Sequence, residues 1–321
     1  MSLISPLDKL KIPIIGSPLF IISNPDLVIA QCKAGIVGSF PCLNAREDEG
    51  QPNMLHIWLK KISEELDKYN QENPDNPAAP YAVNHIVHKS NVRLEQDIDI
   101  CAEWKAPIWI TSLGARPEVN KVAHEAKGIV LHDIINNFFA KKAIEKGADG
   151  LVAVAAGAGG HAGTLSPFAL IQEIREWFNG TLLLSGSIAN GGAVLAAQAM
   201  GADLAYIGSA FIATNEANAD QRYKEMITTS SADDIIYTNL FTGVHGNYLK
   251  GSIEAQGLDP NNLEVSDSSQ MNFSSGASKP KSWKEIWGSG QGISAVKSIL
   301  PTSELVKRLN LEYIEAKNNL I

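Results

Sequence analysis

Eight short apolar runs alternate with segments of helical pattern, and this alternation constrains the fold more than any other feature of the sequence. Each run has five or six residues and many of them are β-branched, which is typical of buried strands. Strands that alternate with helices indicate βα units around a parallel sheet. The predicted strands cover residues 12–16, 35–40, 80–84, 107–111, 128–132, 150–155, 181–186 and 204–209.

The segments between these runs have the start and stop signals of helices. Residues 24–35, 137–150 and 190–204 each begin near a capping residue and reach a glycine at or near the end. Two of them close with the same Gly-Ala-Asp sequence, at Gly147 and at Gly201, so the unit echoes itself. Eight such units predict an α/β fold, a (β/α)8 TIM barrel, with a C-terminal cap or lid segment.

The chain is longer than a plain barrel needs. It has 321 residues, against about 250 for a typical barrel, and no linker divides it. We predict a barrel core at 1–226, a cap or lid insertion at 227–290, and a helical segment at 291–321 that packs back on the barrel. Long additions at the carboxyl ends of barrel strands shape substrate pockets, which is why the cap is expected at the barrel mouth.

Charge and hydropathy exclude several classes of partner. The net charge is -8 and no dense Lys/Arg cluster occurs, so the sequence lacks the electrostatic features of a nucleic-acid binder. No apolar stretch is long enough for a membrane span, and the first residues lack the pattern of a secretory signal. We therefore expect a cytoplasmic protein with small-molecule partners, no nucleic acid and no membrane; whether it forms a homodimer is left open.

Cysteine and histidine spacing does not predict a metal site. Cys32, Cys42 and Cys101 are odd in number and contain no Cys-x-x-Cys pair, which argues against a disulfide framework and a zinc knuckle. His85 and His88 have the His-x-x-His spacing, but no carboxylate motif accompanies them. The sequence predicts free thiols, loop histidines and no metal.

The strongest local signal is the glycine-rich stretch 155–164, which directly follows the sixth predicted strand. Small residues such as Gly159 and Gly160 let the backbone approach a flat ligand closely. His161 is the only large polar side chain there, which makes it a catalytic candidate. The alternative is a glycine-rich loop with a structural histidine; a dinucleotide-binding loop is disfavoured because the stretch follows the sixth strand and not the first.

The seventh and eighth predicted strands end in segments rich in backbone donors and hydroxyls, at 185–192 and 206–209. Barrels commonly bind phosphate between these two loops, where neutral N–H groups and a helix N-terminus suffice. The alternative is ordinary helix capping by Ser187 or Asn190.

Four further residues are candidates for the barrel mouth. Asn84 closes the third predicted strand, so its amide could offer both a donor and an acceptor to a heterocycle; the alternative is a turn asparagine. Phe20 follows the first strand, and His245 and Gln291 come from the cap; these three are candidates for the substrate pocket.

Six sequence segments, taken in order, resemble one known family. The segments PIIGSPLF, YAVN, AGAGGHAG, LSGSIANG, AYIGS and GSGQG span nearly the whole chain. Together they resemble the nitronate monooxygenase family, formerly called 2-nitropropane dioxygenases. A sister group, the flavin-dependent enoyl-acyl-carrier-protein reductases, shares much of this pattern.

The resemblance implies an FMN cofactor. It implies that the flavin ring lies near Asn84, Gly159 and Gly160, with His161 beside the ring. It implies that the phosphate binds at the ends of the last two strands, to Gly186, Ser187, Gly208 and Ser209, with Tyr206 and Ile207 in the same segment.

Two positions depart from the family pattern. Ser187 stands where the family usually has a second glycine, and Gly157 stands where the glycine-rich loop commonly has an acidic residue. Contacts made by that acidic side chain therefore do not carry over to this chain.

The activity implied is the oxidation of alkyl nitronates, and of nitroalkanes, with O2 to carbonyl compounds and nitrite. His161 would accept the α-proton of a nitroalkane or, when protonated, hold the nitro group. Two other functions stay open on sequence: an FMN-dependent NAD(P)H reductase of enoyl thioesters or quinones, and a non-catalytic flavin-binding barrel.

Overall fold

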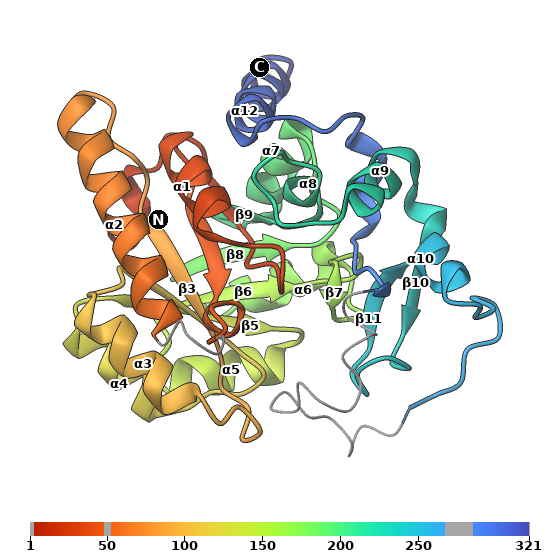
Figure 1. Ribbon diagram of the computed structural model, residues 1–321, viewed down its shortest axis with the longest axis horizontal. Coiled ribbons are helices and arrows are strands. Elements are labelled where there is room, and N and C mark those ends of the chain that lie inside the picture. Colours follow the sequence, from red (N-terminus) through yellow and green to blue (C-terminus); the bar gives the residue numbers. More distant parts are fainter. Residues whose placement is uncertain (1–2, 48–52, 267–284, 321) are drawn as a thin grey trace.

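The computed structural model describes residues 3–47, 53–266 and 285–320, and its centre is a barrel of eight parallel strands (Figure 1). This confirms the predicted (β/α)8 barrel. The barrel strands are β1 (Ile14–Gly16), β2 (Gly38–Pro41), β3 (Tyr81–Ile86), β4 (Ile108–Ser112), β5 (Ile129–Ile134), β6 (Gly150–Val154), β8 (Thr181–Ser185) and β9 (Leu204–Ile207).

The strand order shows how the barrel closes. The eight strands are hydrogen-bonded in the order β1-β9-β8-β6-β5-β4-β3-β2. A parallel bridge between Ile15 and Val37 joins β1 to the entry of β2, with Gly16 N donating to the Val37 carbonyl at 2.8 Å. Because the carboxyl ends of parallel strands meet at one end of a barrel, this closure gathers the loops that follow the strands.

Helices follow the strands and cover the outside of the barrel, except for α10 (Lys250–Ala255), which lies in the cap (Figure 1). They are α1 (Pro25–Lys33), α2 (Met54–Glu72), α3 (Leu94–Glu103), α4 (Pro117–Glu125), α5 (Asn137–Glu145), α6 (Pro167–Arg175), α7 (Gly191–Met200), α8 (Ser209–Ile212), α9 (Gln221–Thr229), α10 (Lys250–Ala255) and α12 (Thr302–Asn318). Short 3-10 helices are η1 (Leu7–Lys9), η2 (Cys42–Asn44), η3 (Ala232–Asp234) and η5 (Gln291–Ala295).

The barrel strands are buried on both faces, which explains why they read as continuous apolar runs and not as alternating ones. All residues of β4 and β6 are buried. Side chains such as Ile110, Leu131 and Leu183 fill the interior, and Leu7 of η1, which is fully buried, belongs to the same cluster. The inside of the barrel is thus a packed core, and open space is confined to its mouth.

A small antiparallel sheet beside the barrel joins the cap to the glycine-rich loop (Figure 1). It consists of β10 (Ile235–Thr238), β11 (Gly246–Leu249) and β7 (Gly160–His161). In its register Gly246 lies opposite His161 and Asn247 opposite Gly160. The sequence did not predict this sheet, because β7 has only two residues and the pairing joins positions far apart in the chain.

The C-terminal helix α12 packs against α7 and α1. Tyr313 donates to Gln198 of α7 at 2.6 Å, and the Glu312 carboxylate accepts from Gly191 N at 2.8 Å. A negative charge at the N-terminus of α7 is favourable for the helix dipole. Within the described ranges, no helix combines the length and apolar character needed to cross a bilayer.

Candidate active site

A large cavity, of about 1600 Å3, opens at the carboxyl ends of the barrel strands. Its volume exceeds the several hundred Å3 that is typical of small-ligand pockets. Every barrel strand contributes a lining residue at its carboxyl end. In chain order these are Ser17, Pro41, Asn84, Ser112, Asp133, Val154, Ser185 and Tyr206.

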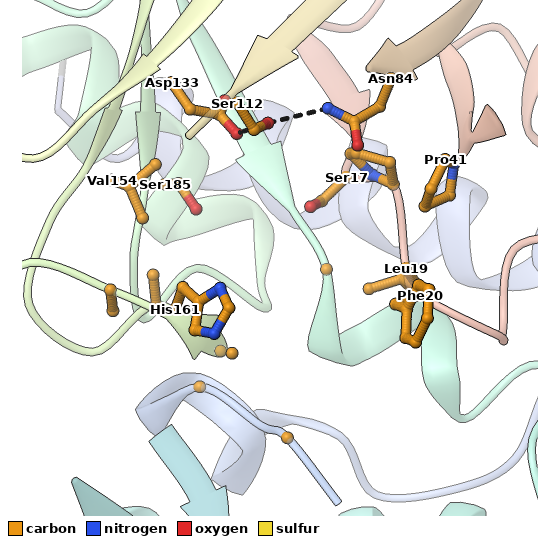
Figure 2. Close-up of a pocket in the computed structure, with 18 of the residues that line it drawn as sticks. Ser17, Leu19, Phe20, Pro41, Asn84, Ser112, Asp133, Val154, His161 and Ser185 are labelled. Carbon is orange, nitrogen blue, oxygen red and sulfur yellow. Dashed lines mark hydrogen bonds between the residues drawn. The ribbon is translucent and has the colours of Figure 1, made fainter. Parts of the chain in front are cut away.

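One side of the cavity is formed by the hydrogen-bonded side chains of Asn84, Ser112 and Asp133, here called the polar wall (Figure 2). Asn84 Nδ2 donates to the Ser112 hydroxyl at 2.8 Å and to the Ile110 carbonyl at 3.2 Å. The Ser112 hydroxyl in turn donates to Asp133 Oδ2 at 2.6 Å. Both amide hydrogens of Asn84 are therefore used inside the protein. Asn84 presents only its oxygen to a ligand, and not the donor and acceptor that we expected from the sequence.

Asp133 ends the polar wall with an unsatisfied acceptor. Its Oδ1 is buried and has no hydrogen-bond partner among the described residues. Burial raises the pKa of Asp133 to about 7, although the hydrogen bond from Ser112 works to lower it. An orphaned buried carboxylate oxygen at a cavity wall is costly unless a ligand N–H or a proton satisfies it. Asp133 and Asn84 together thus present two acceptors to whatever occupies the cavity.

A second part of the cavity lining, here called the glycine wall, presents mainly backbone to the cavity in place of acceptor side chains. It consists of Gly157, Gly159, Gly290, Ser187 and Ser209. Gly157 has φ +82°, which favours glycine. A Cβ on Gly159 would lie 2.8 Å from the Gly290 nitrogen, so a side chain there would collide with backbone. Gly290 N donates to the Ser209 hydroxyl at 2.8 Å. The late GSGQG segment therefore packs directly on the glycine-rich loop and closes this end of the cavity.

The two departures from the family pattern are neighbours in space. A Cβ on Gly157 would lie 2.1 Å from the Ser187 hydroxyl oxygen, and Ser187 N donates to the Gly157 carbonyl at 3.3 Å. The hydroxyl of Ser187 therefore fills the space that a side chain at 157 would need. Gly157 and Ser187 are here called the matched pair, because the missing side chain of the first leaves the space that the hydroxyl of the second occupies.

His161 is held at the cavity by the cap. Its backbone pairs with β11, and its Nε2 lies 2.9 Å from the Thr242 hydroxyl. The same hydroxyl donates to the Val244 carbonyl at 2.9 Å, so it accepts from His161, which places the ring proton on Nε2 and leaves Nδ1 unprotonated. Burial lowers the pKa of His161 to about 4. The imidazole is therefore neutral at pH 7.

The structure brings together most of the residues predicted for the site. His161 and Phe20 lie on different sides of the cavity (Figure 2). The predicted residues that line the cavity are Asn84, Gly159, Gly160, His161, Gly186, Ser187, Tyr206, Gly208, Ser209 and Phe20.

Three predicted residues lie elsewhere. The Ile207 side chain is fully buried in an apolar cluster with Ile14 and Ala205. His245 is exposed and stacks on Tyr237, with ring centroids 5.1 Å apart, outside the main cavity. Gln291 is exposed and does not line the main cavity, and its backbone N–H donates to the Gly157 carbonyl at 2.9 Å.

Two sequence interpretations need correction or refinement. His85 was predicted to be a loop histidine, but β3 continues to Ile86 and buries it. Asn190 caps α7 by accepting from Ala193 N at 2.7 Å, so the capping alternative holds for Asn190. Ser187 lies outside the capping position.

Sequence reasoning missed Ser112 and Asp133. Each follows directly on a predicted strand, at 107–111 and 128–132, because the predicted strands end before β4 and β5 do, at Ser112 and Ile134. The signal was the position itself: the first polar residue after a barrel strand points to the mouth. His132 was missed as well; burial and then Lys146 lower its pKa to about 4, and it lies 2.6 Å from the Thr111 hydroxyl.

Comparison with known proteins identifies the family of the chain. The sequence model described as nitronate monooxygenase matches residues 2–312. The chain belongs to the nitronate monooxygenase family. A nitronate monooxygenase from Paraburkholderia phytofirmans is 26% identical over 352 residues, covering 96% of this chain and 93% of that protein.

Solved structures confirm the fold. The nitroalkane oxidase of Streptomyces ansochromogenes has a TM-score of 0.79 at 21% identity, covering 98% of this chain and 99% of that one. FabK from Thermotoga maritima has a TM-score of 0.76 at 20% identity, covering 97% and 96%. At these identities the structural likeness supports the barrel architecture.

Membership in the nitronate monooxygenase family makes this chain an oxidoreductase and implies a flavin cofactor and small-molecule substrates. The cavity fits that implication. The acceptors of the polar wall match the N–H groups of a heterocycle, and the glycine wall leaves space beside its backbone for a flat ring. The cavity volume is also sufficient for a flavin together with a small substrate.

Proposed function

We propose that the chain is an FMN-dependent nitronate monooxygenase that oxidises alkyl nitronates with O2 to carbonyl compounds and nitrite. The observation that carries this proposal is the neutral imidazole of His161, held by Thr242 at a glycine-lined cavity whose polar wall presents two acceptor oxygens. Small-molecule substrate and O2 would share the space between His161 and Phe20.

The residues present fit FMN in two parts. Asn84 Oδ1 and Asp133 Oδ1 would accept from N–H groups of the ring. The backbone and hydroxyl groups of Gly186, Ser187, Gly208 and Ser209 would hold the phosphate without a cationic partner. FMN would supply the electron transfer that neither histidine nor backbone can perform.

The electrostatics favour one of the two roles considered for His161. Because burial lowers its pKa to about 4, the ring does not carry the positive charge needed to hold an anionic nitro group as a cation at pH 7. The neutral ring can instead accept the α-proton of a nitroalkane, because the nitronate anion formed beside it would stabilise the resulting imidazolium against the burial that lowers its pKa. A preformed nitronate has already lost that proton. His161 is then required for nitroalkanes more than for nitronates.

Nitrite release by variants tests this role. We expect His161→Ala and His161→Asn to lose about a hundredfold or more of the rate with a nitroalkane, the usual size of a general-base effect, and to keep most of the rate with the preformed nitronate. His245→Ala is the matched control, since this histidine lies outside the main cavity, and it should keep both activities. If both His161 variants retain full activity with both substrates, the role is wrong.

Anaerobic mixing with NADH separates the proposal from its rivals. Rapid loss of flavin absorbance with NADH, together with indifference to nitronate, would identify a reductase. Bound flavin that responds to neither NADH nor nitronate, with no nitrite formed, would identify a non-catalytic flavin-binding barrel. The monooxygenase proposal predicts a response to nitronate.

A further inference from the structure

Three soft donor side chains converge on the outer side of β3, away from the cavity. They are Cys42 of η2, His85 of β3 and Cys101 of α3, and here they are called the Cys-His-Cys cluster. Cys42 and His85 are 1% exposed and Cys101 is fully buried. The three donors come from separate elements and meet in the core. Because burying polar groups costs free energy unless they have partners, their convergence indicates a function for the cluster.

The distances within the cluster match a shared ion. The sulfurs of Cys42 and Cys101 are 3.7 Å apart, and His85 Nε2 lies 4.0 Å from Cys42 Sγ. All three donor atoms lie within 4.8 Å of one another. Two thiolates on one tetrahedral zinc ion lie about 3.8 Å apart, because each Zn–S bond is about 2.3 Å long. Small side-chain adjustments would bring all three donors to one centre.

The surroundings orient the histidine for ligation. The His85 ring stacks on the buried Trp109 ring, with centroids 4.9 Å apart and planes inclined by 27°, which fixes the ring plane. Nε2 faces the thiols, while Nδ1 is buried without a hydrogen-bond partner in the described part of the chain. A histidine ligand usually donates its second N–H to a carboxylate or carbonyl, and this N–H still needs such an acceptor.

Asp97 is the candidate for that acceptor. It is four residues before Cys101 in α3, so both side chains lie on one face of the helix. Its Oδ2 is buried and unpartnered among the described residues, while Oδ1 accepts from Arg93 at 2.9 Å. Burial works to lower the pKa of His85, and Cys42 and then Asp97 raise it, with a net upward shift. The charge of Asp97 is therefore felt at the ring.

We propose that the Cys-His-Cys cluster binds a thiophilic d10 metal ion, Zn2+ or Cu+, through Cys42 Sγ, His85 Nε2 and Cys101 Sγ. Two thiolates and an imidazole select soft and borderline ions, and the absence of an oxygen donor in this set disfavours Mg2+ and Ca2+. Three ligands suit Cu+ directly, whereas Zn2+ would take a further ligand. Because Pro41 and Asn84 precede Cys42 and His85 and line the cavity, the ion would brace the cavity wall from behind.

Metal content of the whole protein tests the proposal. Since the donors are buried, the ion is loaded during expression with added Zn2+ or Cu+, and the protein is purified anaerobically with a thiol-free reductant. We expect equimolar zinc or copper by elemental mass spectrometry. Chain grown with Co2+ should show a thiolate-to-cobalt charge-transfer band in the near ultraviolet.

The variants define the site. Cys42→Ser, Cys101→Ser and His85→Gln should each lower metal content at least tenfold and remove the cobalt band. Cys32→Ser is the matched control, because Cys32 is also a buried cysteine but contacts the Pro80 carbonyl instead of the cluster; it should keep both signals. The folded state of each variant is checked by its circular dichroism.

Two results would overturn the proposal. One is reduced wild-type protein that holds no more zinc, copper or cobalt than Cys42→Ser. The other is a Cys42–Cys101 disulfide in the freshly purified protein, shown by mass spectrometry after alkylation, together with no metal uptake once it is reduced. A metal-dependent rise in Tm that Cys32→Ser keeps and Cys101→Ser loses would support it.

Discussion

The glycine wall and the polar wall line the same cavity but are built in different ways. The glycine wall is made of backbone from distant segments in close contact, and the Gly159 and Gly290 backbones leave no space for a Cβ. The polar wall is made of side chains, Asn84, Ser112 and Asp133, in a chain of hydrogen bonds. We expect added side-chain volume to destabilise the glycine wall, and lost hydrogen bonds or a change of pH to destabilise the polar wall.

Asp133→Asn, in the polar wall, should change the free energy of unfolding more than any variant of the glycine wall. The pKa of Asp133 is about 7 in the folded protein against an ordinary value of 3.8, so the folded state binds the proton more tightly. The contribution of Asp133 to wild-type stability therefore falls as pH rises from about 4 to 7 and is flat above. The free energy of unfolding of Asp133→Asn minus that of wild type should rise across this window, by up to about 4 kcal/mol.

Denaturant unfolding of the flavin-free protein at several pH values measures this difference. The falling stability that His132 and His161 cause toward acid pH cancels in the comparison, since both residues are present in each protein. A difference that stays constant from pH 5 to pH 8 would show that Asp133 is not a buried carboxyl of raised pKa.

Gly159→Ala should break the glycine wall. Its Cβ would lie 2.8 Å from Gly290 N and 3.0 Å from the Ser289 carbonyl carbon, and backbone cannot rotate away. Overpacking of this kind costs about 3 kcal/mol at the upper end, and flavin content should fall with stability. Gly192→Ala is the control, because its Cβ would meet Asn190 at 3.5 Å, an ordinary contact. Equal flavin content in the two variants would refute the close approach.

Ser112→Ala should have a smaller effect, on the polar wall. It leaves Asn84 Nδ2 and Asp133 Oδ2 each without the hydrogen bond that Ser112 provides, which costs about 2 kcal/mol in the free energy of unfolding. Ser185→Ala, at the end of β8, is the control, because the Ser185 hydroxyl makes no hydrogen bond in the part of the chain that the structure describes. Thermal unfolding that does not distinguish the two variants would contradict the polar wall.

The matched pair of Gly157 and Ser187 should give the smallest effect. Gly157→Ala places a Cβ 2.1 Å from the Ser187 hydroxyl oxygen, and Ser187→Gly removes that hydroxyl. In a double-mutant cycle the second change should recover about 1 kcal/mol of the loss, while the strain of φ +82° at position 157 persists. Strict additivity of the two changes in unfolding free energy would show that the positions do not compete for space.

The sequence predicted the fold well because apolar runs and helix caps are local signals. All eight barrel strands were located, as was the loop that carries His161. Ser112 and Asp133 were missed because the end of a strand is set by its neighbours in the sheet, which a single sequence does not show. Thr242, the partner of His161, also escaped prediction, because the two residues are 81 positions apart in the chain and meet only where β7 pairs with β11.

The Cys-His-Cys cluster illustrates the same limit. Positions 42, 85 and 101 have no motif spacing, and each residue taken alone is an ordinary buried side chain. Only the closed barrel brings η2, β3 and α3 to one point. Local chemistry can thus be read from a sequence, whereas chemistry assembled by topology needs the fold.

The most direct test of the central claim is the visible absorption spectrum of the purified protein before and after anaerobic addition of an alkyl nitronate. We predict a flavin spectrum whose absorbance falls with nitronate and recovers when O2 is admitted, with nitrite in solution, and FMN as the cofactor released on denaturation. A colourless protein that takes up no FMN, or a bound flavin that ignores the nitronate, would contradict the account.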